Sequence, residues 1–167
     1  DKGMKIERVV SDGAQGLKKG IAEAELEIEH QLDLFHTLRE VLRVEKYLER
    51  EAYRAISQEA EREKVIDSAK SLRVFLKRYE QWEKAVMTIE NQIERYELYS
   101  WLVQELREGL EFVDAETGCL RSVEEMEAIV GVVSLLMREI PHLKVQAIAE
   151  RLERQKGELV KYIAPLQ

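Results

Sequence analysis

Asp12 is the first residue whose type and position suggest metal chemistry. It follows Lys5–Val10, whose β-branched ending is typical of a strand entering a core, and it precedes the turn-forming residue Gly13. A carboxylate at the carboxyl end of a buried strand is held rigidly and can ligate Mg²⁺, as two-metal phosphoryl transfer requires. Asp12 could instead cap a helix that begins near Ala14, and the local sequence alone favours that ordinary role.

An acid and an imidazole, Asp33 and His36, follow the next expected strand. That strand is Leu26–Leu32, in which apolar and polar residues alternate. Asp33 and His36 fall on one side of the first turn of an expected helix, so they could share a metal ion or a hydrogen bond. The ordinary alternative is an N-cap aspartate beside a satisfied histidine, and for two isolated residues it is the better explanation.

Other familiar chemical motifs are excluded. The glycine-rich stretch Gly13–Gly20 has the spacing of neither the Walker A loop nor the dinucleotide fingerprint, so no nucleotide-binding site is predicted. Cys119 is the single cysteine, which rules out an internal disulfide and a cysteine-rich zinc site.

The elements that must position these residues are mostly helices. Between the two strands, Ala14–Glu25 has apolar residues at three- and four-residue spacing, which predicts a short amphipathic helix and hence a βαβ unit. Beyond Asp33, the apolar pattern predicts a first long helix, which weakens near Ile66–Ser68. Asp114–Gly118 is a stop signal, and the pattern Ser122–Glu125 is a capping box that opens a helix ending before Pro141. A last helix is expected over 143–163.

A second long helix is predicted between these segments, because apolar and aromatic residues recur there in steps of three and four. We expect this seam to be buried, as in a coiled coil. Its aromatic residues, together with Trp101, could stack on a DNA end, but core packing is the commoner role. The seam consists of Leu72, Leu76, Tyr79, Trp82, Val86, Ile89, Ile93, Tyr96, Tyr99, Val103, Leu106, Leu110 and Val113.

These elements predict a mostly α fold class, with a short N-terminal βαβ piece followed by a long-helix antiparallel bundle.

The composition restricts the functions that this chain can have. The net charge of −7 argues against a segment that grips DNA by itself. No run approaches the roughly 20 apolar residues of a membrane span, and no signal peptide is recognisable, so we expect a cytoplasmic protein without a membrane partner.

The order of the first features resembles the DDE transposases of the Mutator-like and related bacterial type. A strand, Ser11-Asp12-Gly13, an amphipathic helix, a second strand and Asp33-x-x-His36 follow one another. In that family a catalytic Asp follows a strand in a Ser/Thr-Asp-Gly context, and a Cys/Asp-x-x-His motif comes shortly after it. The resemblance implies that Asp12 is the second catalytic carboxylate and a Mg²⁺ ligand, and that Asp33 and His36 form the signature motif.

The resemblance also implies a domain organisation. Residues 1–36 would be part of a ribonuclease H-like catalytic core, and residues 37–167 would be an all-helical insertion domain. The insertion domain is assigned only because it is helical and follows the motif. The first catalytic carboxylate has no counterpart here, and the catalytic Glu is expected beyond Gln167. We therefore expect an inactive internal fragment of an enzyme that uses Mg²⁺ to cut and join DNA at transposon ends.

A second function class fits the same sequence. The long seam could pair with itself or with a partner, as in a helical coiled-coil-like interaction or scaffold protein. A homo-oligomer formed through the seam is then expected.

Overall fold

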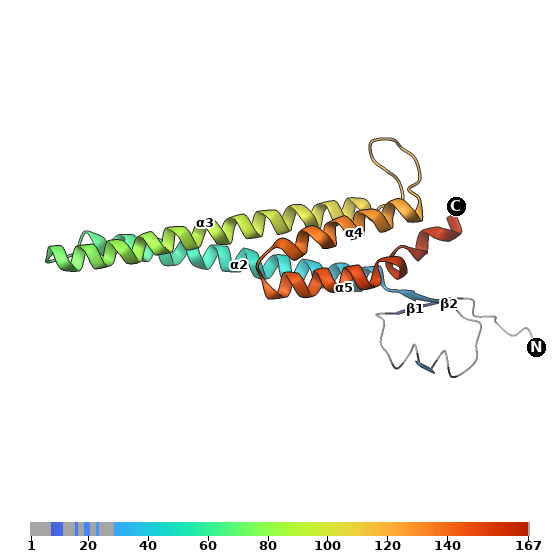
Figure 1. Cartoon of the computed structure of the whole chain (residues 1–167), viewed down its shortest axis with the longest axis horizontal. Helices are drawn as coiled ribbons and strands as arrows, with labels where there is room; N and C mark the ends of the chain where they lie inside the picture. Colours follow the sequence, from blue (N-terminus) through green and yellow to red (C-terminus); the bar gives the residue numbers. More distant parts are fainter. Residues whose placement is uncertain (1–7, 12–15, 17–18, 21–22, 24–28, 167) are drawn as a thin grey trace, which may run out of the picture. The chain divides into compact units, whose positions relative to one another are not determined.

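The chain is mostly helical, as its sequence predicts. The computed structural model describes residues 8–11, 16, 19–20, 23 and 29–166. The elements are β1 (Arg8–Ser11), β2 (Glu29–Leu32), α2 (Leu34–Ile66), α3 (Leu72–Gly109), α4 (Val123–Glu139), α5 (Leu143–Leu159) and the 3-10 helix η1 (Lys161–Leu166) (Figure 1). No helix within the described ranges is both long enough and apolar enough to cross a membrane.

The two strands form a parallel pair, in which Arg8 lies opposite Glu29 and Ser11 opposite Leu32. Parallel neighbours need a crossover connection. Gly16, Lys19–Gly20 and Glu23, the described residues of that connection, are helical. The rest of the predicted helix lies outside the described residues, as do positions 5–7 and 26–28 of the predicted strands. Membership of a ribonuclease H-like core stays a prediction.

Two compact units divide the chain: residues 1–41 with 104–167, and residues 42–103. The second unit is an antiparallel hairpin made from the later part of α2 and most of α3. Side chains bridge the two helices along its length: Ser100 donates to Glu45 over 2.7 Å, and Trp82 Nε1 donates to Glu59 over 2.5 Å. Its buried side chains are Leu48, Ala52, Ala55, Ala85, Tyr99, Leu102 and Val103.

Burial along α3 is uneven, and the prediction of a continuously buried seam is wrong at its ends. Leu72, Leu76 and Tyr79 are 73%, 58% and 44% exposed, whereas Tyr99 is fully buried. A heptad pattern specifies which side chains share a face, but the opposing surface decides what is covered. The end of α2 does lie beside the start of α3, where Arg62 and Arg78 bridge the two helices, but it leaves these three side chains exposed. Val113 is also exposed, because α3 ends at Gly109 and Val113 instead forms an isolated bridge with Leu120.

The first unit contains the α4–α5 hairpin, which packs against η1, while α5 also contacts β2. The predicted capping box at Ser122 is confirmed: its hydroxyl accepts from the Glu125 N–H, and the Glu125 carboxylate accepts from the Ser122 N–H. α4 ends before Pro141, as predicted. α5 ends at Leu159, earlier than predicted, and η1 continues the chain. The apolar residues at three- to seven-residue spacing in this segment are all buried: Val145, Ile148, Leu152, Leu159 and Ile163.

Candidate functional site

The carboxyl edge of the strand pair is where the residues suited to metal chemistry were expected. The last residues of β1 and β2, Ser11 and Leu32, are paired, and the Asp33 N–H donates to the Ser11 carbonyl over 2.6 Å. The chain therefore leaves both strands at the same edge. Asp12, the next residue after Ser11, lies outside the described residues, and its catalytic and metal-binding role stays a prediction.

Asp33 is the N-cap of α2. Its Oδ1 accepts hydrogen bonds from the backbone N–H groups of Phe35, over 2.9 Å, and His36, over 3.3 Å. The Asp33 carbonyl accepts from the Thr37 N–H over 3.3 Å. These bonds satisfy donors that have no partner within the helix, which is the ordinary function of an aspartate at this position. The cap therefore sets the start of α2 directly after β2, at the carboxyl edge of the strand pair.

His36 faces a different carboxylate from that of Asp33. Its Nε2 lies 3.3 Å from Glu40 Oε1, one helical turn further along α2. Glu40 Oε2 also accepts a hydrogen bond from Arg151 on α5, and Arg151 Nε donates to Gln155 over 3.1 Å. All of these side chains are partly buried, which limits screening of the charges by water. The network joins the start of α2 to α5, within the first unit.

Sequence reasoning did not identify Glu40 or Arg151. Glu40 could have been found, because a carboxylate four residues after a histidine lies on the same helical face. Arg151 is 111 positions from Glu40, and no local pattern connects the two.

The described residues do not supply a preformed metal centre. In ranges 8–11 and 29–166 and the few described positions between them, no three His, Cys, Asp or Glu side chains are grouped to hold a metal ion. Asp33 Oδ1 is engaged as a cap, and the His36 imidazole faces the Glu40 carboxylate. The expected Mg²⁺ depends on Asp12, together with carboxylates predicted to lie elsewhere in the complete enzyme.

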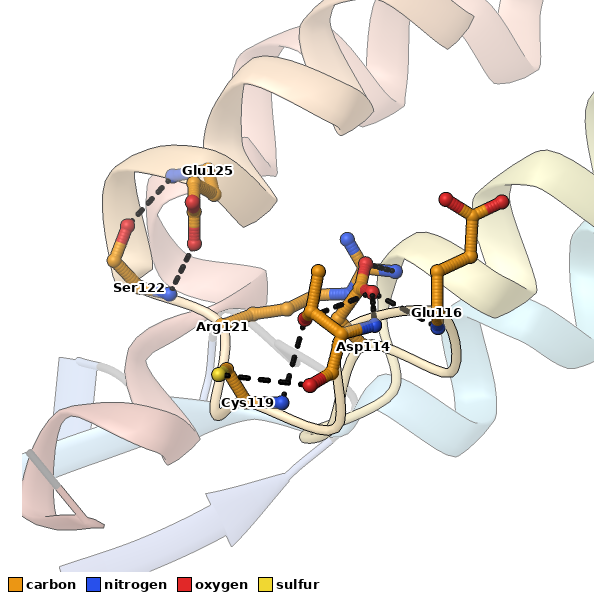
Figure 2. Close-up of polar contacts among 7 residues, drawn as sticks. Asp114, Glu116, Cys119, Arg121, Ser122 and Glu125 are labelled. Atoms are coloured by element: carbon orange, nitrogen blue, oxygen red, sulfur yellow. Dashed lines mark hydrogen bonds and ion pairs between the residues drawn. The ribbon is translucent and has the colours of Figure 1, made fainter.

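A second polar centre lies in the loop between α3 and α4, where the sequence predicts only a stop (Figure 2). Asp114 accepts hydrogen bonds from the backbone N–H groups of Glu116 and Thr117 and from the Thr117 hydroxyl, and it pairs with Arg121 over 2.7 Å. Gly118 has a φ of 68°, a left-handed conformation that costs glycine little. The Asp114 side chain thus closes the loop through its hydrogen bonds and ion pair.

The Asp114 carboxylate is adapted to this structural role. Hydrogen bonds from the Thr117 N–H and hydroxyl, helped by the Arg121 charge, hold the pKa of Asp114 below its usual value. The loop borders a cavity of about 250 Å³ whose lining is strongly acidic and includes Glu105, Glu108, Glu111, Asp114 and Glu116. This lining would repel the phosphates of DNA.

The aromatic residues considered for base stacking differ in their burial and fall into three groups. Tyr99 is fully buried, and burial raises the pKa of its hydroxyl, so it is a core residue. Trp82 and Tyr96 are partly buried. Tyr79 and Trp101 are exposed, and the Tyr79 ring lies 5.4 Å from that of Trp82 between centroids.

Comparisons of the chain with models of protein families, with curated proteins and with solved structures find no match.

Proposed function

We propose that this chain is an internal part of a DDE-type transposase, carrying one catalytic carboxylate and a helical insertion domain. In the complete enzyme, Mg²⁺ held by a set of carboxylates would activate water and then a 3′-hydroxyl for attack on DNA phosphodiesters. Asp12 would be one ligand of that set. The fragment alone lacks the remaining carboxylates and is expected to be inactive.

The strand pair is the single observation that carries the proposal. Parallel strands β1 and β2 end side by side at Ser11 and Leu32, directly before Asp12 and Asp33. Ligands of open α/β sheets bind outside the carboxyl ends of such strands, because loops from neighbouring strands converge there. This arrangement supports a site at the edge where β1 ends, directly before Asp12 in the sequence.

Asp33 and His36 would act as positioning residues at that edge. Asp33 fixes where α2 starts by capping its N–H groups, and His36 contacts Glu40, which is held by Arg151 of α5. The cap and the network together anchor the segment that follows β2. An Asp-x-x-His signature can thus support the site without either residue touching the metal ion.

The test compares Asp12→Asn with Asp67→Asn in the complete protein. Asn caps a helix about as well as Asp, so a capping role for Asp12 predicts little change in stability or transposition. A metal-ligand role predicts that DNA strand cleavage falls by orders of magnitude while the melting temperature is retained. Asp67 is an exposed residue after α2 and provides the matched loss of one charge. Near-normal transposition by Asp12→Asn would exclude the catalytic assignment.

A scaffold protein is the second candidate, and the exposed apolar residues at the start of α3 favour it. Leu72, Leu76 and Tyr79 face solvent in this chain, as expected for a surface that awaits a partner. The flanking sequence of the complete gene product separates the two candidates. An upstream strand ending in Asp and a downstream helical Glu support a transposase, and their absence supports a scaffold.

A further inference from the structure

The hairpin of the second unit ends in an exposed apolar surface with basic residues beside it. We call Leu72, Leu76, Tyr79, Arg73 and Lys77 the tip surface. The three apolar residues are exposed on the first turns of α3, and both basic residues are exposed as well. At 100° per residue, Arg73 and Lys77 form a row beside Leu76, one turn apart. Neither forms an ion pair with any residue of 29–166.

The outer side of α4 is an exposed apolar surface with acidic residues beside it. The α4 surface consists of Ala128, Val132, Leu135, Glu124 and Glu127. Val132 and Leu135 are 57% and 58% exposed, although they lie in the middle of a helix whose other face is core. These five residues line a groove of about 500 Å³, which Gly131 and Lys156 complete. The stretch from Ala128 to Met137 contains no charged residue.

The charges beside this groove that are free to pair with another molecule are mainly acidic. Lys156 is paired with Glu153 over 2.7 Å, and so contributes little free positive charge. Glu124 and Glu127 form no ion pair within the described part of the chain. They are three positions apart on α4 and therefore lie on neighbouring turns of one face, at a spacing similar to that of Arg73 and Lys77 on α3.

We propose that the tip surface of one copy of this chain docks on the α4 surface of a second copy. Leu72 and Leu76 would enter the groove over Val132 and Leu135, while Arg73 and Lys77 would pair with Glu124 and Glu127. Each surface is repelled by a second copy of itself, because both of its charges have the same sign. Charge complementarity thus selects a contact between unlike surfaces, which is a heterologous interface.

The size of the two surfaces predicts a weak association. An interface formed by a few exposed side chains on each copy is at the low end of the size range of specific interfaces. Transient interfaces of this kind bury on the order of 1,200 Å² or less. We expect dimers or larger species at high micromolar concentration. Their stability should fall as salt rises, because exposed ion pairs are screened.

The test uses charge reversal in the 167-residue chain, followed by sedimentation velocity over a range of concentrations. Arg73→Glu with Lys77→Glu should abolish association, and so should Glu124→Lys with Glu127→Lys. Combining all four substitutions in one chain should restore it, because the acidic tip surface then meets a basic α4 surface. Arg50→Glu with Arg54→Glu is the matched control, since both residues are exposed one turn apart on α2; this variant should associate like the unchanged chain.

Three results would overturn the proposal: an unchanged chain that stays monomeric up to about 1 mM, normal association of either double variant, or a monomeric four-fold variant. Circular dichroism establishes that each variant is folded. If the Glu124 and Glu127 variant is not, Leu135→Glu replaces it as the α4-surface variant and should likewise give monomers. Normal association of folded Leu135→Glu also contradicts the proposal.

Discussion

Gly109, the last residue of α3, is the position where a single methyl group should be most informative. A Cβ atom placed there would overlap Ile129 Cγ2 on α4 and lie 3.2 Å from Ile129 Cβ. This close approach of two helices within the first unit depends on the missing side chain. We therefore predict that Gly109→Ala destabilises the unit.

Two opposing effects set the magnitude. Alanine is favoured over glycine within a helix by up to about 1 kcal/mol, but less at a helix end. Overpacking a well-filled contact costs about 1–3 kcal/mol, because β-branched Ile129 has few alternative rotamers. The clash should win by roughly 1–2 kcal/mol, which lowers the melting temperature by about 2–8 °C in a chain of this size.

Gly131→Ala is the matched control in α4. A Cβ atom at Gly131 lies 3.7 Å from Lys156 Nζ, an ordinary contact, so only the gain in helix propensity remains. We expect this variant to be more stable by up to about 1 kcal/mol. Thermal and urea unfolding followed by circular dichroism would measure both changes.

The identity of the clashing residue can be tested in the same assay. Removing Cγ2 and Cδ1 with Ile129→Ala should reduce the cost of a subsequent Gly109→Ala substitution. An equal cost in both backgrounds, or a stabilised Gly109→Ala protein, would refute the reasoning.

Three further predictions concern capping, pH and burial. Asp33→Asn should leave the free energy of unfolding nearly unchanged, whereas Asp33→Ala should lower it by about 1 kcal/mol; equal urea midpoints for the two variants would contradict the cap. Because the pKa of Asp114 is lowered, its contribution to loop stability is present above the unfolded value near 3.8 and is lost as pH falls through the lower folded value. NMR titration of the Asp114 carboxyl and of the Thr117 amide should follow that loss, and an Asp114 midpoint at or above 3.8 would be inconsistent with it. Leu102→Ala, at a fully buried position, should cost about 2–5 kcal/mol, and Leu76→Ala, at an exposed one, far less; similar costs in chemical denaturation would mean that burial along α3 is wrongly assigned.

Local sequence determined the limits of most elements, because the signals that start and stop helices act over a few residues. The Ser122 and Glu125 capping box and the cap at Asp33 were predicted, and each is made by hydrogen bonds within three positions. The stop predicted at Asp114–Gly118 is a turn closed by Asp114, but α3 ends earlier, at Gly109. Pro141 likewise ends α4 by local geometry. The mostly helical fold class followed from the same short-range rules.

Tertiary structure decided what those elements bury and which side chains meet. Apolar spacing placed Leu76 and Tyr99 on one seam, yet Tyr99 is buried and Leu76 is exposed. The pairing of Glu40 with Arg151 and the close approach of Gly109 to Ile129 join segments that are distant in the chain. Burial and long-range pairing depend on the surfaces that come together in space, and periodicity within one helix contains no information about its neighbour.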